Sequence, residues 1–358
     1  MMKYFTGSFI VTVVGIILAY LWGEHVHSGT GLLCVFIALI LGILEVSLSF
    51  DNAVVNAVKL EKMEHIWQHR FLTWGIIIAV FGMRFLFPLL VVAIFAKISI
   101  IKVATIALTD SNQYAHYLHQ THAPIVAFGG AFLAMLFFSY MFNCEKKVHW
   151  IKGVEKYCSH LGNIKGLETI LTLILVLVTH HYVPAEYKAS VLSSGVIGVV
   201  IYLLIDGITH WLEKHEAQRA KELAQVAKGG GLVAFLYLEL IDASFSLDGV
   251  LGAFALSQDI LIITIGLSIG AMFVRSLTIM LVEKKTLDQY IYLEHGAHWA
   301  IGALACLMLV STVREVPEVI TGLIGLVFIV AALISSIVHN KKLENRLAEE
   351  KIEGGENA

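Results

Sequence analysis

The sequence predicts an all-α, polytopic membrane protein of ten transmembrane helices, built around two inverted three-helix repeats. Composition is the first observation behind this prediction: 58% of the 358 residues are hydrophobic and only 15% are charged, whereas soluble domains carry roughly 25% charge. The second is a series of apolar runs of about 20 residues, the length that crosses a bilayer. The third is an acidic motif that occurs twice.

The apolar runs define the predicted spans. Lys3 precedes the first run, as in a signal peptide, but no small-x-small cleavage site follows before Glu24, so we expect a span there. Pro88 is expected to bend the third span. The runs lie near 6–22, 31–58, 71–96, 124–142, 167–183, 189–211, 231–257, 259–282, 296–312 and 319–338.

The positions of the positive charges agree with ten spans. With loops alternating between the two sides, the side of the N-terminus receives 19 of the 25 Lys and Arg residues and the other side receives 4. The remaining two, Arg84 and Arg275, lie inside spans. Because cytoplasmic loops retain Lys and Arg, we expect both termini in the cytoplasm.

The acidic motif reads "EVSLSFDNAV" at 45–54 and "DASFSLDGVL" at 242–251. The likeness continues in the next span, since "GIIIAVFGMR" ends at Arg84 and "GLSIGAMFVR" ends at Arg275, each opening on a glycine nine residues earlier. In the predicted topology the two copies have opposite orientations. Inverted repeats are typical of secondary transporters, which hold the ligand near the midplane of the bilayer.

The repeats divide the chain into units. We expect a peripheral first span at 1–30, repeat one at 31–142, a cytosolic loop with bridging spans at 143–230, repeat two at 231–312, a last span at 313–340 and a charged cytosolic tail at 341–358.

Carboxylates inside a span need a role or a partner, since one at the bilayer centre costs roughly 2.5 to 3.5 kcal/mol. On an ideal helix Ser49 and Asn52 share a face with Glu45, whereas Asp51 lies about 120° away. A local unwinding between Glu45 and Asp51 would bring both faces onto one cavity, and we expect one there.

The motifs supply hard oxygen donors and contain no Cys or His, which favours Mg, Ca or Mn over Zn or Cu. Arg84 and Arg275 are the predicted counter-ions. Glu239 is the weakest candidate, since its counterpart in the first copy is Gly42. The predicted metal ligands are Glu45, Ser49, Asp51, Asn52, Glu239, Asp242, Ser246 and Asp248.

Other readings of these residues stay open. The acids and arginines can form a purely structural ion network, and Ser47 and Ser244 can serve helix packing alone. His116, His119 and His122, spaced by three in an outer loop, are a second candidate metal site. The four cysteines are scattered, so neither a zinc ribbon nor a disulfide framework is predicted.

The two motifs, with the endings "SFDNAVV" and "SLDGVLGAF", resemble those of the TerC-type integral membrane proteins, named for tellurium resistance, over residues 31–312. That family is similar to the lysine-exporter superfamily, and several members are associated with manganese export. The chain is longer than the core of about seven spans, which suggests an uncharacterised longer branch. The resemblance implies a metal exporter of the bacterial inner (plasma) membrane, with the family's acidic positions at Glu45, Asp51, Asn52, Asp242 and Asp248.

The predicted function is export of a divalent cation, manganese first, by alternating access, with protons as the coupling ion. The alternative is a non-transporting membrane subunit of a tellurium or metal stress-response complex, which would dock partners through the loops at 59–70, 143–166 and 213–230. No HExxH or GxSxG motif is present, so an enzyme is not predicted. We expect a bilayer environment, no resident cofactor and no nucleic-acid partner, and a homo-oligomer stays open.

Overall fold

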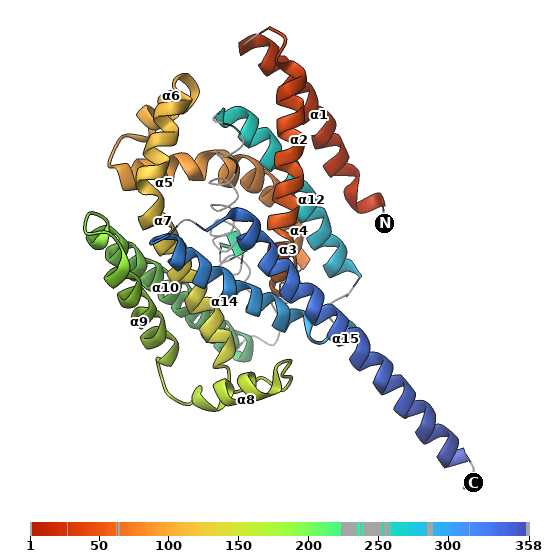
Figure 1. The fold of residues 1–358 in the computed structure, drawn as a ribbon. Helices are drawn as coiled ribbons and strands as arrows, with labels where there is room; N and C mark the ends of the chain where they lie inside the picture. Colours follow the sequence, from red (N-terminus) through yellow and green to blue (C-terminus); the bar gives the residue numbers. More distant parts are fainter. Residues whose placement is uncertain are drawn as a thin grey trace.

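The computed structural model describes residues 2–355, apart from 27, 62, 64, 223–234, 237, 240–252, 254–256, 258, 285–288 and 315. Every regular element in that part is a helix, which confirms the all-α prediction (Figure 1). The helices are α1 (Met2–Val26), α2 (Gly31–Leu48), α3 (Phe50–Glu61), α4 (His65–Ile77), the π-helix η1 (Ile78–Leu86), α5 (Phe87–Ala96), α6 (Ile100–Thr109), α7 (Ser111–Met141), α8 (Lys152–Leu161), α9 (Leu167–Tyr182), α10 (Lys188–Glu222), α12 (Ile260–Glu283), α14 (Leu293–Ser311) and α15 (Glu318–Gly355).

Six helices of the described residues are long and apolar enough to cross a membrane, or seven if one bent pair counts as a span. The protein is therefore a multi-pass membrane protein. The six lie in α1, α7, α10, α12, α14 and α15, at six of the ten predicted runs. The described residues do not confirm ten spans. The run at 167–183 is α9, which has only 16 residues, and most of the run at 231–257 lies outside the described residues.

Two predicted spans are interrupted. The run at 31–58 is divided between α2 and α3, which meet at Ser49, where φ is -104° and ψ is 17°. The run at 71–96 is divided among α4, η1 and α5, with a bend of 42° between 66–75 and 80–86. Pro88 lies in the first turn of α5, a position that proline tolerates, so it marks the start of a helix.

Two contacts at different levels of each helix pair give the relative directions of the long helices. α2 is parallel to α12 and α10 is parallel to α7, whereas α1 is antiparallel to α12 and α14 is antiparallel to α7 and α15. The contacts are Ser8 with Ser276 and Trp22 with Asp259 (α1, α12), Leu41 with Gly266 and Glu45 with Gly270 (α2, α12), Phe128 with Gly198 and Phe132 with Tyr202 (α7, α10), Gly129 with Met308 and Tyr140 with His298 (α7, α14), and Tyr292 with Ser336 and Trp299 with Phe328 (α14, α15).

Capping side chains place the starts of two helices. Asp259 accepts hydrogen bonds from the backbone N–H groups of Leu261 and Ile262, at 2.9 and 3.3 Å, and begins α12. Asp110 accepts one from the N–H of Gln113 at 3.0 Å and begins α7. The prediction of an outer loop for the three histidines is therefore wrong: they lie on the first turns of α7, because this cap starts the helix well before the apolar run.

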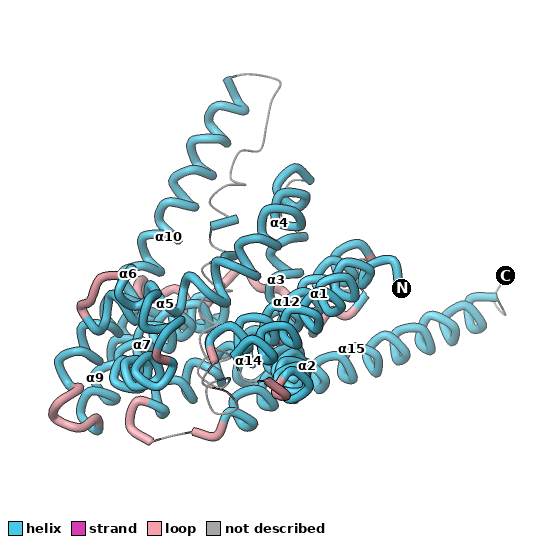
Figure 2. The backbone as a smooth tube through the Cα atoms, turned by 90° about the horizontal axis from the view of Figure 1, so that it is seen from above, coloured by secondary structure: helices cyan, strands magenta, loops and turns pink. Residues whose placement is uncertain are grey.

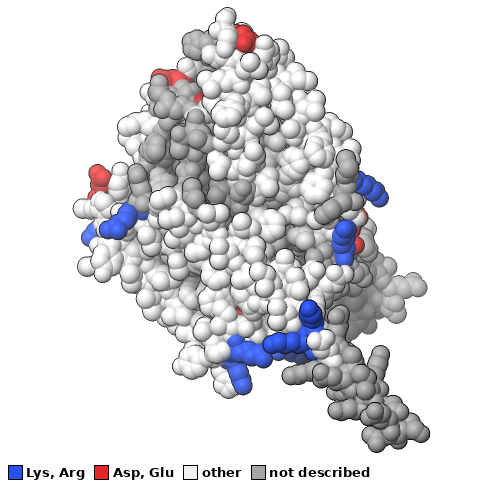
Figure 3. Space-filling model, turned by 45° about the vertical axis from the view of Figure 1, so that its right-hand side comes forward, with Lys and Arg blue, Asp and Glu red and all other residues white. Residues whose placement is uncertain are grey.

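The surface is mostly uncharged. α1 exposes a series of large apolar side chains, among them Val13 at 58% and Ile17 at 53%, and such an expanse suits contact with lipid. Figure 3 shows a face whose middle is almost free of charge, with Lys and Arg at its left, right and lower edges. α10 and α15 continue beyond the packed body (Figure 2), past the ends of their apolar segments at Ile208 and Leu343.

Candidate functional site

Glu45 lies beside the interruption between α2 and α3. Its side chain is fully buried. The hydroxyl of Ser49 donates to Glu45 Oε1 at 2.8 Å, and the N–H of Ser49 donates to the carbonyl of Glu45 at 2.9 Å. The helix is interrupted between Glu45 and Asp51, but only at Ser49, whose N–H keeps the bond to the residue four positions earlier. The side chain of Asp51 lies outside the described residues, so the expected convergence of the two faces on one cavity stays a prediction. The break leaves a serine hydroxyl and a carboxylate side by side inside the protein.

Arg84 is the charged partner of Glu45. It lies on η1, and its Nη2 donates to Glu45 Oε1 in a short ion pair. Both side chains are shielded from solvent, at 2% and 0% exposure. Isolated π-helical turns occur frequently at functional sites, and here the π-helix carries the cation that neutralises the buried acid.

Small residues bring α12 against α2 next to this pair. A Cβ atom added to Gly266 would lie 2.8 Å from the carbonyl oxygen of Ala38, and one added to Gly270 would lie 2.6 Å from that of Gly42. Two glycines four residues apart allow this close backbone contact, as in membrane helix pairs generally. The backbone that carries Glu45 is thus fixed against α12.

Arg275 and Glu239 meet at a second glycine. The guanidinium carbon of Arg275 lies 4.2 Å from the centroid of the Phe71 ring, a favourable cation–π distance. A Cβ atom added to Gly75 on α4 would overlap Nη2 of Arg275 and lie 3.0 Å from Oε1 of Glu239. Both charged side chains are buried, so Gly75 provides the room for them.

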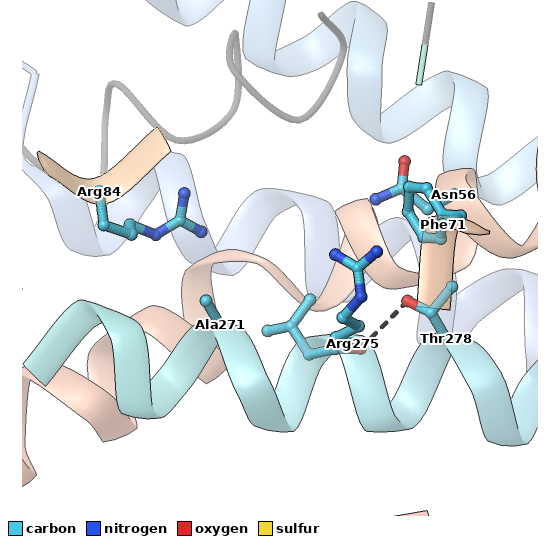
Figure 4. Close-up of a pocket in the computed structure, with 7 residues that line it drawn as sticks. Asn56, Phe71, Arg84, Ala271, Arg275 and Thr278 are labelled. Atoms are coloured by element: carbon cyan, nitrogen blue, oxygen red, sulfur yellow. Dashed lines mark hydrogen bonds between the residues drawn. The ribbon is translucent and has the colours of Figure 1, made fainter. Parts of the chain in front are cut away.

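A small cavity lies between the two arginines. Figure 4 shows their guanidinium groups, one from η1 and one from α12, directed toward the same space. Its volume is about 20 Å³, enough for one water molecule or one small ion. The lining residues are Asn56, Phe71, Arg84, Ala271, Val274, Arg275 and Thr278.

Two of the polar lining residues were missed by the sequence analysis. Asn56 is 4% exposed, and its Oδ1 has no hydrogen-bond partner among the described residues. The signal for it was its spacing of four from Asn52 within an apolar run. The hydroxyl of Thr278, three residues after Arg275, lies 3.0 Å from the carbonyl oxygen of Val274 on its own helix and 3.3 Å from that of Ala53 on α3. Nothing in the sequence pattern indicated the second contact.

The predicted ligands fall into three groups. Glu45, Ser49 and Arg84 are in direct contact, and Asn52 is buried on α3. Glu239 lies beside Arg275. Asp51 belongs to the first turn of α3, and its side chain, like Asp242, Ser246 and Asp248, lies outside the described residues.

The described residues do not by themselves form a metal centre, since no group of three or more His, Cys, Asp or Glu among them could hold an ion. The described lining of the cavity is rich in N–H donors. Oxygen ligands for a cation would come from Glu45, from Asn56 Oδ1 and from the motif acids that are not described.

A comparison with protein families gives one match. A family described as "Protein of unknown function (DUF475)" matches residues 50–343. No curated protein and no solved structure matches the chain. Because the match runs from the start of α3 into α15 and covers more than half of the chain, the protein belongs to the DUF475 family.

Proposed function

We propose that the protein is a membrane transporter that exports a divalent cation, with manganese as the first candidate, by alternating access at the buried carboxylates. The observation that carries the proposal is the Glu45–Arg84 ion pair at the break between α2 and α3. Buried ionisable groups in membrane helices mark ion pathways more often than structural supports. The resemblance of the two acidic motifs to TerC-type proteins points to the same substrate class.

The chemistry of the pair is suited to competition. Arg84 neutralises Glu45 through Oε1, whereas Glu45 Oε2 has no hydrogen-bond partner among the described residues. A cation that takes Glu45 as a ligand therefore competes with the positive charge of the guanidinium group. Protons compete for the same carboxylate, which couples their movement to that of the metal. The neighbouring Ser49 hydroxyl and Asn56 Oδ1 are hard donors of the kind that Mn²⁺ accepts.

The helix directions support ten alternating spans. In that topology α2, α7, α10, α12 and α15 run toward the side of the N-terminus, and α1 and α14 run away from it. Each parallel and antiparallel pair agrees with this assignment. From the Lys and Arg asymmetry and the resemblance to TerC-type proteins, we propose that both termini lie in the cytoplasm of a bacterium and that the spans cross its inner membrane.

A reciprocal contact supports the inverted repeats. Gly42 of the first copy lies against Gly266, with 3.3 Å between an added Cβ and the Gly266 carbonyl oxygen. Glu239, the counterpart of Gly42, lies against Gly75, the counterpart of Gly266. A two-fold axis relating the repeats requires this exchange of partners.

The proposal is tested by transport. Asp51→Ala and Asp248→Ala should each abolish rescue of manganese-sensitive cells at unchanged protein level, whereas Glu186→Ala, at an exposed acid outside the motifs, should leave rescue intact. Uptake of Mn²⁺ into proteoliposomes of purified protein then measures transport directly. Full rescue by both motif variants would refute the proposal.

A second candidate, a non-transporting subunit of a stress-response complex, draws on the shape of the protein. α10 and α15 extend well beyond their apolar segments and past the packed body, and such projections suit docking of other proteins. A scaffold would give no Mn²⁺ flux in proteoliposomes, so the same measurement separates the two functions.

A further inference from the structure

The connection between α7 and α9 contains the short helix α8, which lies across the ends of these longer helices (Figure 1). Its sequence, KGVEKYCSHL, reads from composition alone as a charged loop. The structure instead shows a helix that is held at two points and presents a defined outer surface.

Glu155 is the first point of attachment. It is fully buried and accepts four hydrogen bonds, from the N–H groups of Trp150 and Ile151 at 3.1 and 3.3 Å, from Trp299 Nε1 at 3.0 Å and from His295 Nδ1 at 2.7 Å. Two partners belong to the connection and two to α14. A buried carboxylate is tolerated with this number of partners, and they fix the rotation of α8 about its axis.

The charge of Glu155 is retained at neutral pH. Burial alone would raise the pKa of this carboxyl group, but hydrogen bonds from His295 and Trp299 and the positive charge of Lys146 together lower the pKa to about 2. The amine of Lys146 lies 3.5 Å from Glu155 Oε2. Glu155 is therefore ionised at neutral pH and can accept all of these hydrogen bonds.

The second point of attachment is at the far end of α8. The hydroxyl of Ser159 donates to the carbonyl of Asn143 at 3.0 Å. A Cβ atom at Gly162 would overlap the carbonyl oxygen of Phe142, so the end of α8 packs directly on the end of α7. With both ends held, α8 stays flat against the bundle.

With Glu155 facing inward, the rest of α8 divides into two flanks at about 100° per residue. Val154, Tyr157 and Leu161 lie on one flank, and Val154 and Tyr157 are 48% and 68% exposed. Lys152, Lys156 and His160 lie on the other and are all exposed.

The segments beside α8 continue both properties. Val148, Ile151 and Ile164 add exposed apolar side chains, and Lys147 and Lys165 add exposed positive charge. The only exposed acid between 143 and 166 is Glu145. An apolar flank beside a basic flank is the pattern of helices that lie in the plane of a membrane surface.

We propose that α8 and its flanking lysines form an in-plane docking surface for anionic phospholipid, with the apolar flank at the acyl boundary and Lys147, Lys152, Lys156 and Lys165 on the headgroups. Charge complementarity selects this occupant: the surface is basic and apolar, and α8 lies across the helix ends, at the level where headgroups meet a multi-pass protein. The proposal depends on the membrane assignment and is independent of transport.

Brominated lipids test the proposal with the full-length protein in nanodiscs. His160→Cys, in a background without the native cysteines, carries a fluorophore on the basic flank of α8. Quenching by brominated phosphatidylglycerol is compared with quenching by brominated phosphatidylcholine at equal dilution in unlabelled lipid. We expect at least a fivefold preference for the anionic lipid, about the contribution of one lysine near a charged surface, and a smaller preference at high salt.

Two variants make the result specific. Replacing Lys147, Lys152, Lys156 and Lys165 with Gln should remove the preference, and these exposed positions should not affect folding. Replacing Lys97 and Lys102 with Gln, at exposed positions on other segments, should leave it unchanged. Equal quenching by both lipids in the protein that keeps all its lysines would overturn the proposal. Absence of quenching by either lipid would also overturn it, and would indicate that a protein partner covers α8.

Discussion

Removing both charges of the Glu45–Arg84 pair should cost far less stability than removing either one. The two side chains are 0% and 2% exposed and form a direct ion pair. Glu45→Met strands a buried guanidinium, and Arg84→Met strands a buried carboxylate, so each should lower the free energy of unfolding by roughly 3 to 5 kcal/mol. The double variant leaves no unpaired charge and packs two thioether side chains of similar volume, so it should approach the unchanged protein.

Thermal unfolding of the purified protein in detergent measures this cycle, with manganese transport measured on the same four samples. A double variant that is as destabilised as the sum of the two single variants would refute a direct pair. A stable double variant that fails to transport would assign the pair to function, whereas one with full transport would show that Glu45 is only part of a structural ion network.

Three further predictions follow from the packing. Gly270→Ala should lower the free energy of unfolding by roughly 1 to 3 kcal/mol because its Cβ would overlap α2. A Cβ added to Gly207 has no atom within 4 Å, so Gly207→Ala should be neutral or slightly stabilising, and thermal unfolding of the two variants measures the difference. The Glu155 carboxyl group has a pKa lowered from 4.5 to about 2, so its contribution to the free energy of unfolding is complete above pH 4.5 and is lost as the pH falls toward 2. In Glu155→Gln the unfolding temperature should therefore change less with pH between 4.5 and 2. Ser8→Ala removes the 2.7 Å hydroxyl contact with Ser276 and should loosen α1 by about 1 kcal/mol, read as faster proteolysis of α1 in detergent.

The sequence predicts best what depends on transfer from water to lipid. α1, α7, α10, α12, α14 and α15 all lie at predicted apolar runs, because hydropathy sums the same side-chain energies that keep a helix in a bilayer. It predicts winding less well. The run at 71–96 is apolar apart from Thr73 and Arg84, yet it is divided by η1. Hydropathy carries no information on which backbone hydrogen bonds a helix makes.

Long-range polar contacts were missed for a different reason. The sequence shows Glu155 only as one charge in a loop. Its partners His295 and Trp299 lie 140 and 144 positions later in the chain, and the fold places them in contact with it. Single-sequence patterns report on neighbours within a few turns. Ser49 is the informative exception, because the faces of Glu45 and Asp51 could not converge on an unbroken helix, and that geometric conflict alone indicated the break.

The packing around the site separates rigid elements from deformable ones. α2 and α12 touch through backbone atoms at Gly266 and Gly270, so neither helix can slide without a clash. α3 begins at the break after Ser49, and η1 carries Arg84 on π-helical turns, which are rare in proteins and frequent at functional sites. If Glu45 is exposed alternately to the two sides, as the proposed transport requires, we expect α3 and η1 to move against the closely packed α2–α12 pair. The stabilities of Gly270→Ala and of the Glu45 and Arg84 variants measure these two parts of the site separately.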